Sequence, residues 1–172
     1  MPFSPLTAVH FGVGIALLVL GLSLFRLPKL RNPWHGRMGE AYFWVLTFTV
    51  GSGLVDGVIR QLRQHTGISP FEVVTVPTWC FALLGYLVAK RRPKDWLRWH
   101  ITGQAGSFIG VITAGGFLFR GNLLPDTLTV NATIWAVPQI VGAALITRTT
   151  LTWVGPPRWL RARQRRRSRS DS

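Results

Sequence analysis

Five apolar runs of membrane-spanning length follow one another along the chain, separated by short polar and basic segments. A helix needs about 20 mostly apolar residues to cross a bilayer core of about 30 Å. The pattern therefore predicts an all-α integral membrane bundle. Its five transmembrane helices should cover residues 6–25, 41–59, 70–89, 100–119 and 128–146.

Local signals mark the ends of some of these helices. Asn32 and Pro33 suit an N-cap and a first helical position, because the cap satisfies one backbone donor and proline has none to satisfy there. The second helix should therefore begin before residue 41. Asp95 is a candidate N-cap for the fourth. Pro77 and Pro138 lie inside the third and fifth helices and should bend or loosen them.

The first run resembles a secretory signal peptide only in its position. Residues 1–5 carry no positive charge, and no small-residue cleavage site follows the run. We expect it to be retained as a helix. The chain then divides into a transmembrane bundle over residues 1–150 and an arginine-rich cytoplasmic tail over residues 151–172, which should be partly disordered.

Composition agrees with a membrane protein. Hydrophobic side chains make up 48% of the chain and charged ones 15%, against about a quarter charged in ordinary soluble domains. The net charge of +14 could indicate a nucleic-acid partner. The basic residues, however, lie between and after the apolar runs, which argues against nucleic acid and favours the lipid bilayer as the partner.

The distribution of basic residues predicts the orientation. Of the 20 Lys and Arg, 17 follow the first, third or fifth run, and the other three are Arg60, Arg63 and Arg120. Positive residues favour the cytoplasmic side, so the N-terminus should be outside and the C-terminus cytoplasmic. The arginines of the tail should bind anionic lipid. Six tryptophans near the cytoplasmic ends should act as interfacial anchors: Trp34, Trp44, Trp96, Trp99, Trp153 and Trp159.

Small residues line the fourth run at four-residue intervals. Gly106 with Gly110, and Gly103 with Ser107, form small-x-x-x-small pairs that let a neighbouring backbone approach closely. One interpretation is tight packing within the bundle, or association with a second copy or another membrane protein. The other is that the missing side chains leave space for a flat cofactor or lipid.

His35 and His100 are the sharpest candidates for chemistry. The second and fourth helices should both begin at the cytoplasmic side, which brings these histidines to similar depth on parallel helices. Two neutral imidazoles that face one another could ligate a haem iron, with haem b as the cofactor. The alternative is that each histidine contacts headgroups, loop carbonyls or a carboxylate such as Glu40.

A second group of ionisable residues should collect on the outer side, where His10, Asp56 and Glu72 lie near the ends of the first three helices. Ionisable groups inside a membrane are costly and are functional candidates for that reason. These three could form a proton or cation site. They could also pair locally or reach the interface, because each is within a turn or two of it.

Several classes of enzyme lack support in the sequence. We find no HExxH, no P-loop, no GxSxG and no paired intramembrane carboxylates. Cys80 is the only cysteine, which excludes an intramolecular disulfide and a multi-cysteine metal site. Because it lies inside an apolar run, we expect a buried, inert thiol.

Three stretches carry a family resemblance: AVHFGVGIALLVLG, NPWHGRMGEAYFWVLT and LVAKRRPKDWLRWHITGQAGSFIGVITA. Over residues 6–146 the chain resembles bacterial predicted membrane proteins of the domain-of-unknown-function 2306 group. The resemblance implies a multi-pass inner-membrane protein and brings no established activity. The chain departs from the pattern at Glu72, where relatives often carry a histidine. The positions that match it are His10, His35, His100, Gly106, Ser107 and Pro138.

Three functions remain open at this point. The leading one is a small haem-binding or cofactor-binding electron-transfer protein of the membrane, with His35 and His100 as ligands. The second is a proton-linked transporter component that uses His10, Asp56 and Glu72. The third is a non-catalytic assembly partner that associates through the glycine face of the fourth helix.

Overall fold

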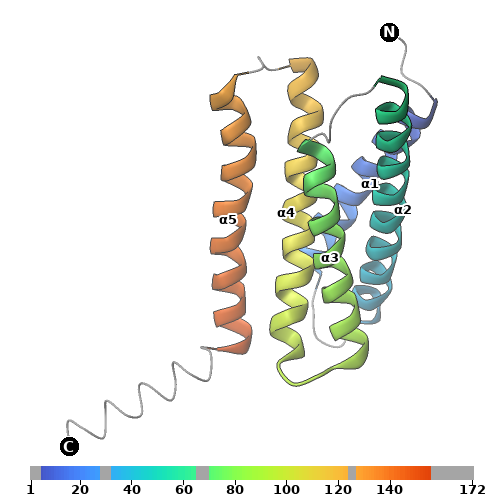
Figure 1. The fold of residues 1–172 in the computed structure, drawn as a ribbon. Coiled ribbons are helices and arrows are strands. Elements are labelled where there is room, and N and C mark those ends of the chain that lie inside the picture. Colours follow the sequence, from blue (N-terminus) through green and yellow to red (C-terminus); the bar gives the residue numbers. More distant parts are fainter. Residues whose placement is uncertain (1–4, 28–31, 65–69, 124–126, 156–172) are drawn as a thin grey trace, which may run out of the picture.

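A computed structural model describes residues 5–27, 32–64, 70–123 and 127–155, without the side chains of a few residues at helix ends. The described residues form five helices and no strands, so the prediction of an all-α bundle is confirmed (Figure 1). The helices are α1 (Pro5–Arg26), α2 (Pro33–Gln64), α3 (Pro70–Arg91), α4 (Trp96–Leu123) and α5 (Leu128–Val154).

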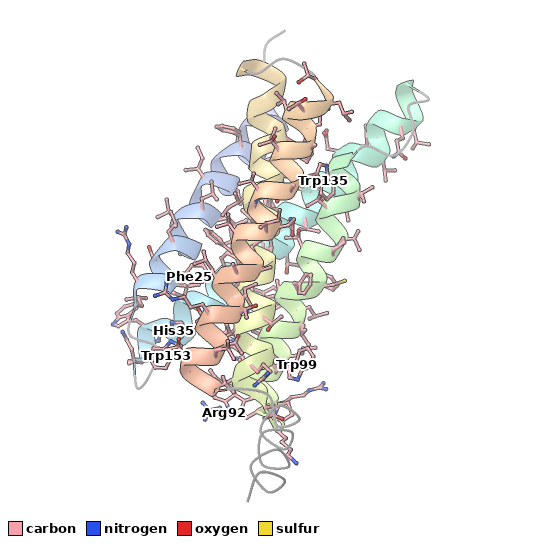
Figure 2. The ribbon with its side chains drawn as sticks, turned by 90° about the vertical axis from the view of Figure 1, so that its left-hand side faces the viewer. Phe25, His35, Arg92, Trp99, Trp135 and Trp153 are labelled. Carbon is pink, nitrogen blue, oxygen red and sulfur yellow. The ribbon has the colours of Figure 1, made fainter. Side chains whose placement is uncertain are left out.

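Successive helices run in opposite directions along one axis (Figure 1). We call the end where α1, α3 and α5 finish and α2 and α4 start the basic end, because most Lys and Arg of the described residues lie near it. It is the lower end in Figure 1. Figure 2 shows Arg92, Trp99 and Trp153 at this end, whereas Trp135 lies toward the opposite one. Trp99 and Trp153 are about half exposed, as aromatic residues at a membrane interface are.

Four helices are long and apolar enough to cross a membrane, namely α1, α2, α3 and α5. The chain is therefore a multi-pass membrane protein by the length and composition of its helices. At 28 residues α4 also has the length, and it runs beside α3 and α5 between the same two ends (Figure 1). Glycines and polar side chains lower the mean hydropathy of α4. A helix packed between two others can be less apolar, because little of its surface faces lipid.

The start of α2 follows the predicted cap. The side chain of Asn32 accepts a hydrogen bond from the Trp34 amide at 3.0 Å, and Pro33 is the first helical residue. Asp95 directly precedes α4, and its carbonyl accepts from the Arg98 amide at 3.0 Å. Its φ of 62° is left-handed, however, and not the extended conformation usual for an N-cap.

The first four helices enclose one core. Contacts join α1 to α2, α2 to α3, α3 to α4 and α4 back to α1, so these helices form a closed ring around the bundle axis. All four helices contribute buried side chains to the core, large ones on α1, α2 and α4 and a small one on α3. The members of the buried cluster are Leu17, Tyr42, Phe43, Leu46, Ala82 and Phe108.

The fifth helix lies outside this ring and contacts α4 (Figure 1). The side-chain amide of Gln139 donates to the Thr113 hydroxyl at 3.1 Å, an interhelical bond that gives this polar group a partner inside the bundle. Gly142 is buried against the side chain of Ile109. At the basic end, Arg98 donates to the Gly155 carbonyl at 3.0 Å. Since α5 continues to Val154, the first residues assigned to the tail are helical, and residues 156–172 lie outside the described residues.

The predicted burial of Cys80 is wrong. The thiol is exposed on the surface of α3, where it borders a shallow groove with Pro77 and Phe81. The sequence pattern could not separate the two situations, because an apolar run in a membrane helix serves the lipid-facing side as well as the core.

Candidate functional site

The structure brings His35 and His100 together. Their ring centres lie 6.4 Å apart, and the ring planes are nearly perpendicular at 77°. His35 comes from the first turn of α2 and His100 from the second turn of α4. These two helices start at the same end of the bundle, and Figure 2 shows His35 at that basic end. We call the two residues the histidine pair.

His100 is held in one tautomer by the neighbouring helix. Its Nδ1 lies 2.9 Å from the carbonyl oxygen of Gly85 on α3. A carbonyl can only accept, so Nδ1 carries the hydrogen, and in the neutral ring Nε2 carries the lone pair. Metal-binding histidines commonly donate their second ring N–H to a carbonyl or carboxylate in this way.

A close helix crossing makes this contact available. A Cβ placed on Gly103 would lie 2.7 Å from the Cα of Gly85, and one placed on Gly85 would lie 2.9 Å from the amide nitrogen of Gln104. Side chains at either glycine would push α3 and α4 apart. The absence of both side chains lets the imidazole of His100 reach a backbone carbonyl of α3.

The other three predicted packing positions of α4 face two neighbouring helices. Gly106 faces the ring of Phe81, and Gly110 faces the side chain of Thr78, both on α3. Ser107 instead points into the core, where it is fully buried and lies 3.2 Å from the hydroxyl of Tyr42 on α2. Three of the four predicted packing positions therefore face α3, and the fourth faces α2.

Side chains of α2 and α4 approach one another at two levels that are seven residues apart on each helix. Two turns beyond the histidine pair come Tyr42 and Ser107, and two turns further come Thr49 and Ala114, which border a cavity. Position 39 shares this face of α2 with position 35. It is a glycine whose added Cβ would meet nothing within 4 Å, so α2 leaves space between the histidine pair and Tyr42.

Glu40, the carboxylate considered as a histidine partner, binds α3. Its Oε1 accepts from the Tyr86 hydroxyl at 3.3 Å and from Lys90 Nζ at 3.2 Å. Tyr86 also stacks on Phe43, with ring centres 4.3 Å apart and planes inclined by 8°. These contacts turn Glu40 toward the outer wall of the basic end.

The second predicted group is only partly described. His10 on α1 lies 3.3 Å from the Ser52 hydroxyl on α2 through Nδ1. Ser52 donates its own hydrogen to the Thr49 carbonyl at 3.0 Å, so Nδ1 of His10 is the donor in their bond. Asp56 interacts with His10 electrostatically. Glu72 belongs to α3, but its side chain lies outside the described residues.

Two residues of this site, Tyr42 and Gly85, are not among those predicted from the sequence. The seven-residue spacing from His35 to Tyr42 and from His100 to Ser107 was a signal that could have found the first of them. No pattern marks Gly85, because its role depends on which helix crosses α4 at that height.

Comparison with known proteins adds no relative. No family model, no curated protein and no solved structure matches the chain. The resemblance to the domain-of-unknown-function 2306 group therefore stays an expectation, and function has to be argued from the geometry.

Proposed function

We propose that this multi-pass membrane protein binds haem b between His35 and His100 and acts in electron transfer. The proposal is carried by the separation of 6.4 Å between the two ring centres. An imidazole nitrogen lies about 2 Å from a metal that it ligates, which puts the centres of two imidazoles on opposite sides of one metal roughly 6 Å apart. The histidine pair has the spacing of two axial haem ligands.

The residue types favour haem over a bare metal ion. Among the described residues, no group of three or more His, Cys, Asp or Glu could hold a metal ion. A bare ion such as zinc takes three or four protein ligands. A porphyrin supplies four nitrogen ligands to its iron, so the protein needs to supply only one or two more. The histidine pair can supply two.

The surrounding residues have roles that suit this ligand. The Gly85 carbonyl orients His100 and increases the basicity of its Nε2. The space beside Gly39 lies on the face of α2 that carries His35. Tyr42 and Ser107 close the core beyond that space and separate it from the rest of the bundle. Haem, when bound, supplies one-electron chemistry at the basic end of the bundle.

An absorbance spectrum tests the proposal. The protein would be expressed with added haem precursor, purified in detergent and reduced with dithionite. We expect a Soret band, with the visible bands of a six-coordinate low-spin haem. His35→Ala and His100→Ala should each abolish the low-spin spectrum. His10→Ala, which removes a histidine at the opposite end, is the matched control and should leave it unchanged.

Two results would overturn the proposal. One is a wild-type protein that shows no Soret band even after reconstitution with haemin. The other is a low-spin spectrum that persists when both His35 and His100 are alanine. Helix content from circular dichroism and a monodisperse elution profile show in each case that the variant has folded.

A second candidate function uses the opposite end of the bundle. His10 donates to Ser52 and interacts with Asp56, which is the kind of coupled pair that a proton-linked transporter component needs. In proteoliposomes carrying a pH-sensitive dye, His10→Ala and Asp56→Asn should then reduce proton flux, as should Glu72→Gln. Flux that is the same in wild type and in the triple variant would reject this candidate.

We further propose that the protein resides in the bacterial inner membrane with its tail in the cytoplasm. The excess of basic residues at one end supports that orientation. Each Lys or Arg near an anionic surface contributes about 1 kcal/mol of attraction, so the tail should bind anionic lipid. Removal of residues 161–172 should reduce the anionic lipid that co-purifies with the protein, as measured by mass spectrometry.

A further inference from the structure

A cavity of about 90 Å³ lies among the first four helices, away from the histidine pair. On α2 it begins at Leu46, about one turn beyond Tyr42, and on α1 it extends to His10 near the start of the helix. From His35 to Leu46 the distance along α2 is about 16 Å. The residues that bound the cavity on its four helices include His10, Leu17, Leu46, Thr78, Gly110 and Ala114.

The wall of this cavity is almost entirely carbon, although polar residues contribute to it. The hydroxyl of Thr49 donates to the Val45 carbonyl at 2.8 Å, and that of Thr78 donates to the Val74 carbonyl at 2.7 Å. Both hydrogens are therefore directed into the threonines' own helices. Apolar cavities do not hold water stably, so the wall suits a hydrocarbon occupant.

The cavity can be reached sideways, from the bilayer. Phe11 and Ile15 of α1 border it and are 43% and 49% exposed on the outer surface of the bundle. Across from them, Gly115 of α4 borders it too. A Cβ added at Gly14 or Gly115 would meet nothing within 4 Å, so α1 and α4 leave a gap here. Nearer the basic end the same helices touch, with Gly21 packed on Phe108.

We propose that this cavity binds the acyl chain of a membrane lipid, which enters between α1 and α4. Three of the four helices around it, α1, α2 and α3, are long and apolar enough to cross a membrane, and the exposed side chains at its mouth face the hydrocarbon of that membrane. A carbon-lined cavity that opens to the bilayer can take up the hydrocarbon chains of the surrounding lipids. The inference is independent of haem binding, because the two sites lie at different levels of the bundle.

Photo-crosslinking tests the proposal in the wild-type protein. The full chain would be reconstituted into vesicles of phosphatidylethanolamine and phosphatidylglycerol that contain a small fraction of phosphatidylcholine with a diazirine near the end of one acyl chain. After irradiation, mass spectrometry of peptides maps the attachment sites. We expect crosslinks at Leu18 and Val111, which line the cavity, several-fold above those at Ile140, which is exposed on α5.

Filling the cavity should remove those crosslinks. Gly14→Leu and Gly115→Leu place side chains in the open space from two different helices, so a folding defect in one leaves the other as a test. Each should lower the cavity crosslinks several-fold while the crosslinks at Ile140 persist. Gly12→Leu and Gly51→Leu are matched controls, because both glycines are exposed, have open space around them and do not line the cavity.

Three results would overturn the proposal. The first is labelling of Leu18 and Val111 at or below the level of Ile140. The second is labelling of the cavity that stays unchanged in both filling variants. The third is an equal loss of cavity labelling in the filling variants and in the controls, which would mean that any added bulk on these helices has the same effect.

Discussion

The hydroxyl of Tyr42 on α2 donates to the hydroxyl of Ser107 on α4 at 3.2 Å, in the centre of the bundle. Tyr42 is the donor in this bond because the Ser107 hydroxyl donates its own hydrogen to the Gln104 carbonyl at 2.8 Å. Tyr42 is 1% exposed and Ser107 is 0% exposed. This bond joins two helices that face each other across the core, and it separates the histidine pair from the acyl-chain cavity.

Removal of this bond should weaken the bundle modestly. Interhelical hydrogen bonds in membrane proteins contribute about 0.6 kcal/mol on average and up to about 1.7 kcal/mol. We expect Tyr42→Phe to lower the free energy of unfolding by an amount in that range, measured by titration with SDS in mixed micelles. Ser107→Ala should cost a similar amount, and the double variant little more than either one. Additive losses would mean that the two hydroxyls act separately.

Substitution of Gly85 should disturb the histidine pair through the backbone. A Cβ at this position would lie 2.9 Å from the amide nitrogen of Gln104, and overpacking of a close contact costs typically about 1–3 kcal/mol. Gly85→Ala should therefore lower the thermal midpoint and weaken haem binding, because His100 loses its approach to the Gly85 carbonyl. Gly51→Ala, at an open position of α2, is the control. Equal stability of the two variants would contradict the close crossing.

Filling the cavity should stabilise the protein in detergent. An empty cavity costs about 24 cal/mol per Å³, so the cavity of about 90 Å³ represents on the order of 2 kcal/mol when empty. Gly115→Leu recovers part of this, and we expect a rise in thermal midpoint in lipid-free detergent. The gain should shrink when lipid is added, since an acyl chain then fills the space in the wild type. A lower midpoint for Gly115→Leu under both conditions would show that the space is too small for leucine.

Labelling of single cysteines should reveal the orientation. In a Cys80→Ser background, Ser69→Cys lies in the segment between α2 and α3, and Ser170→Cys lies in the tail. A membrane-impermeant maleimide added to intact bacterial cells should label Ser69→Cys only, and inverted membrane vesicles should give the opposite result, because basic segments stay in the cytoplasm. The reverse pattern would place the N-terminus inside. Native Cys80 should resist labelling from both sides, since it is exposed on a helix surface that faces lipid.

The class of protein and the succession of helices follow from the amino-acid sequence alone. Apolar runs of spanning length can satisfy their backbone groups in a membrane only as helices, and short connections oblige neighbours to run antiparallel. Because directions alternate, α2 and α4 start at the same end, and His35 and His100 both lie near those starts. Even the start of α2 was predictable, because Asn32 and Pro33 act locally on the first turn.

Which helix faces meet becomes visible in the folded bundle and not in the sequence. Apolar side chains suit lipid and core equally well, so the sequence pattern could not distinguish the exposed Cys80 from the buried Leu46. Nor could it show that α3 crosses α4 at Gly85, which orients His100, or that α1 diverges from α4 beside Gly14 and leaves a cavity. The rotation of each helix and the height at which two helices cross depend on many packing contacts. In a membrane, the pattern of polar and apolar residues does not show this rotation or height.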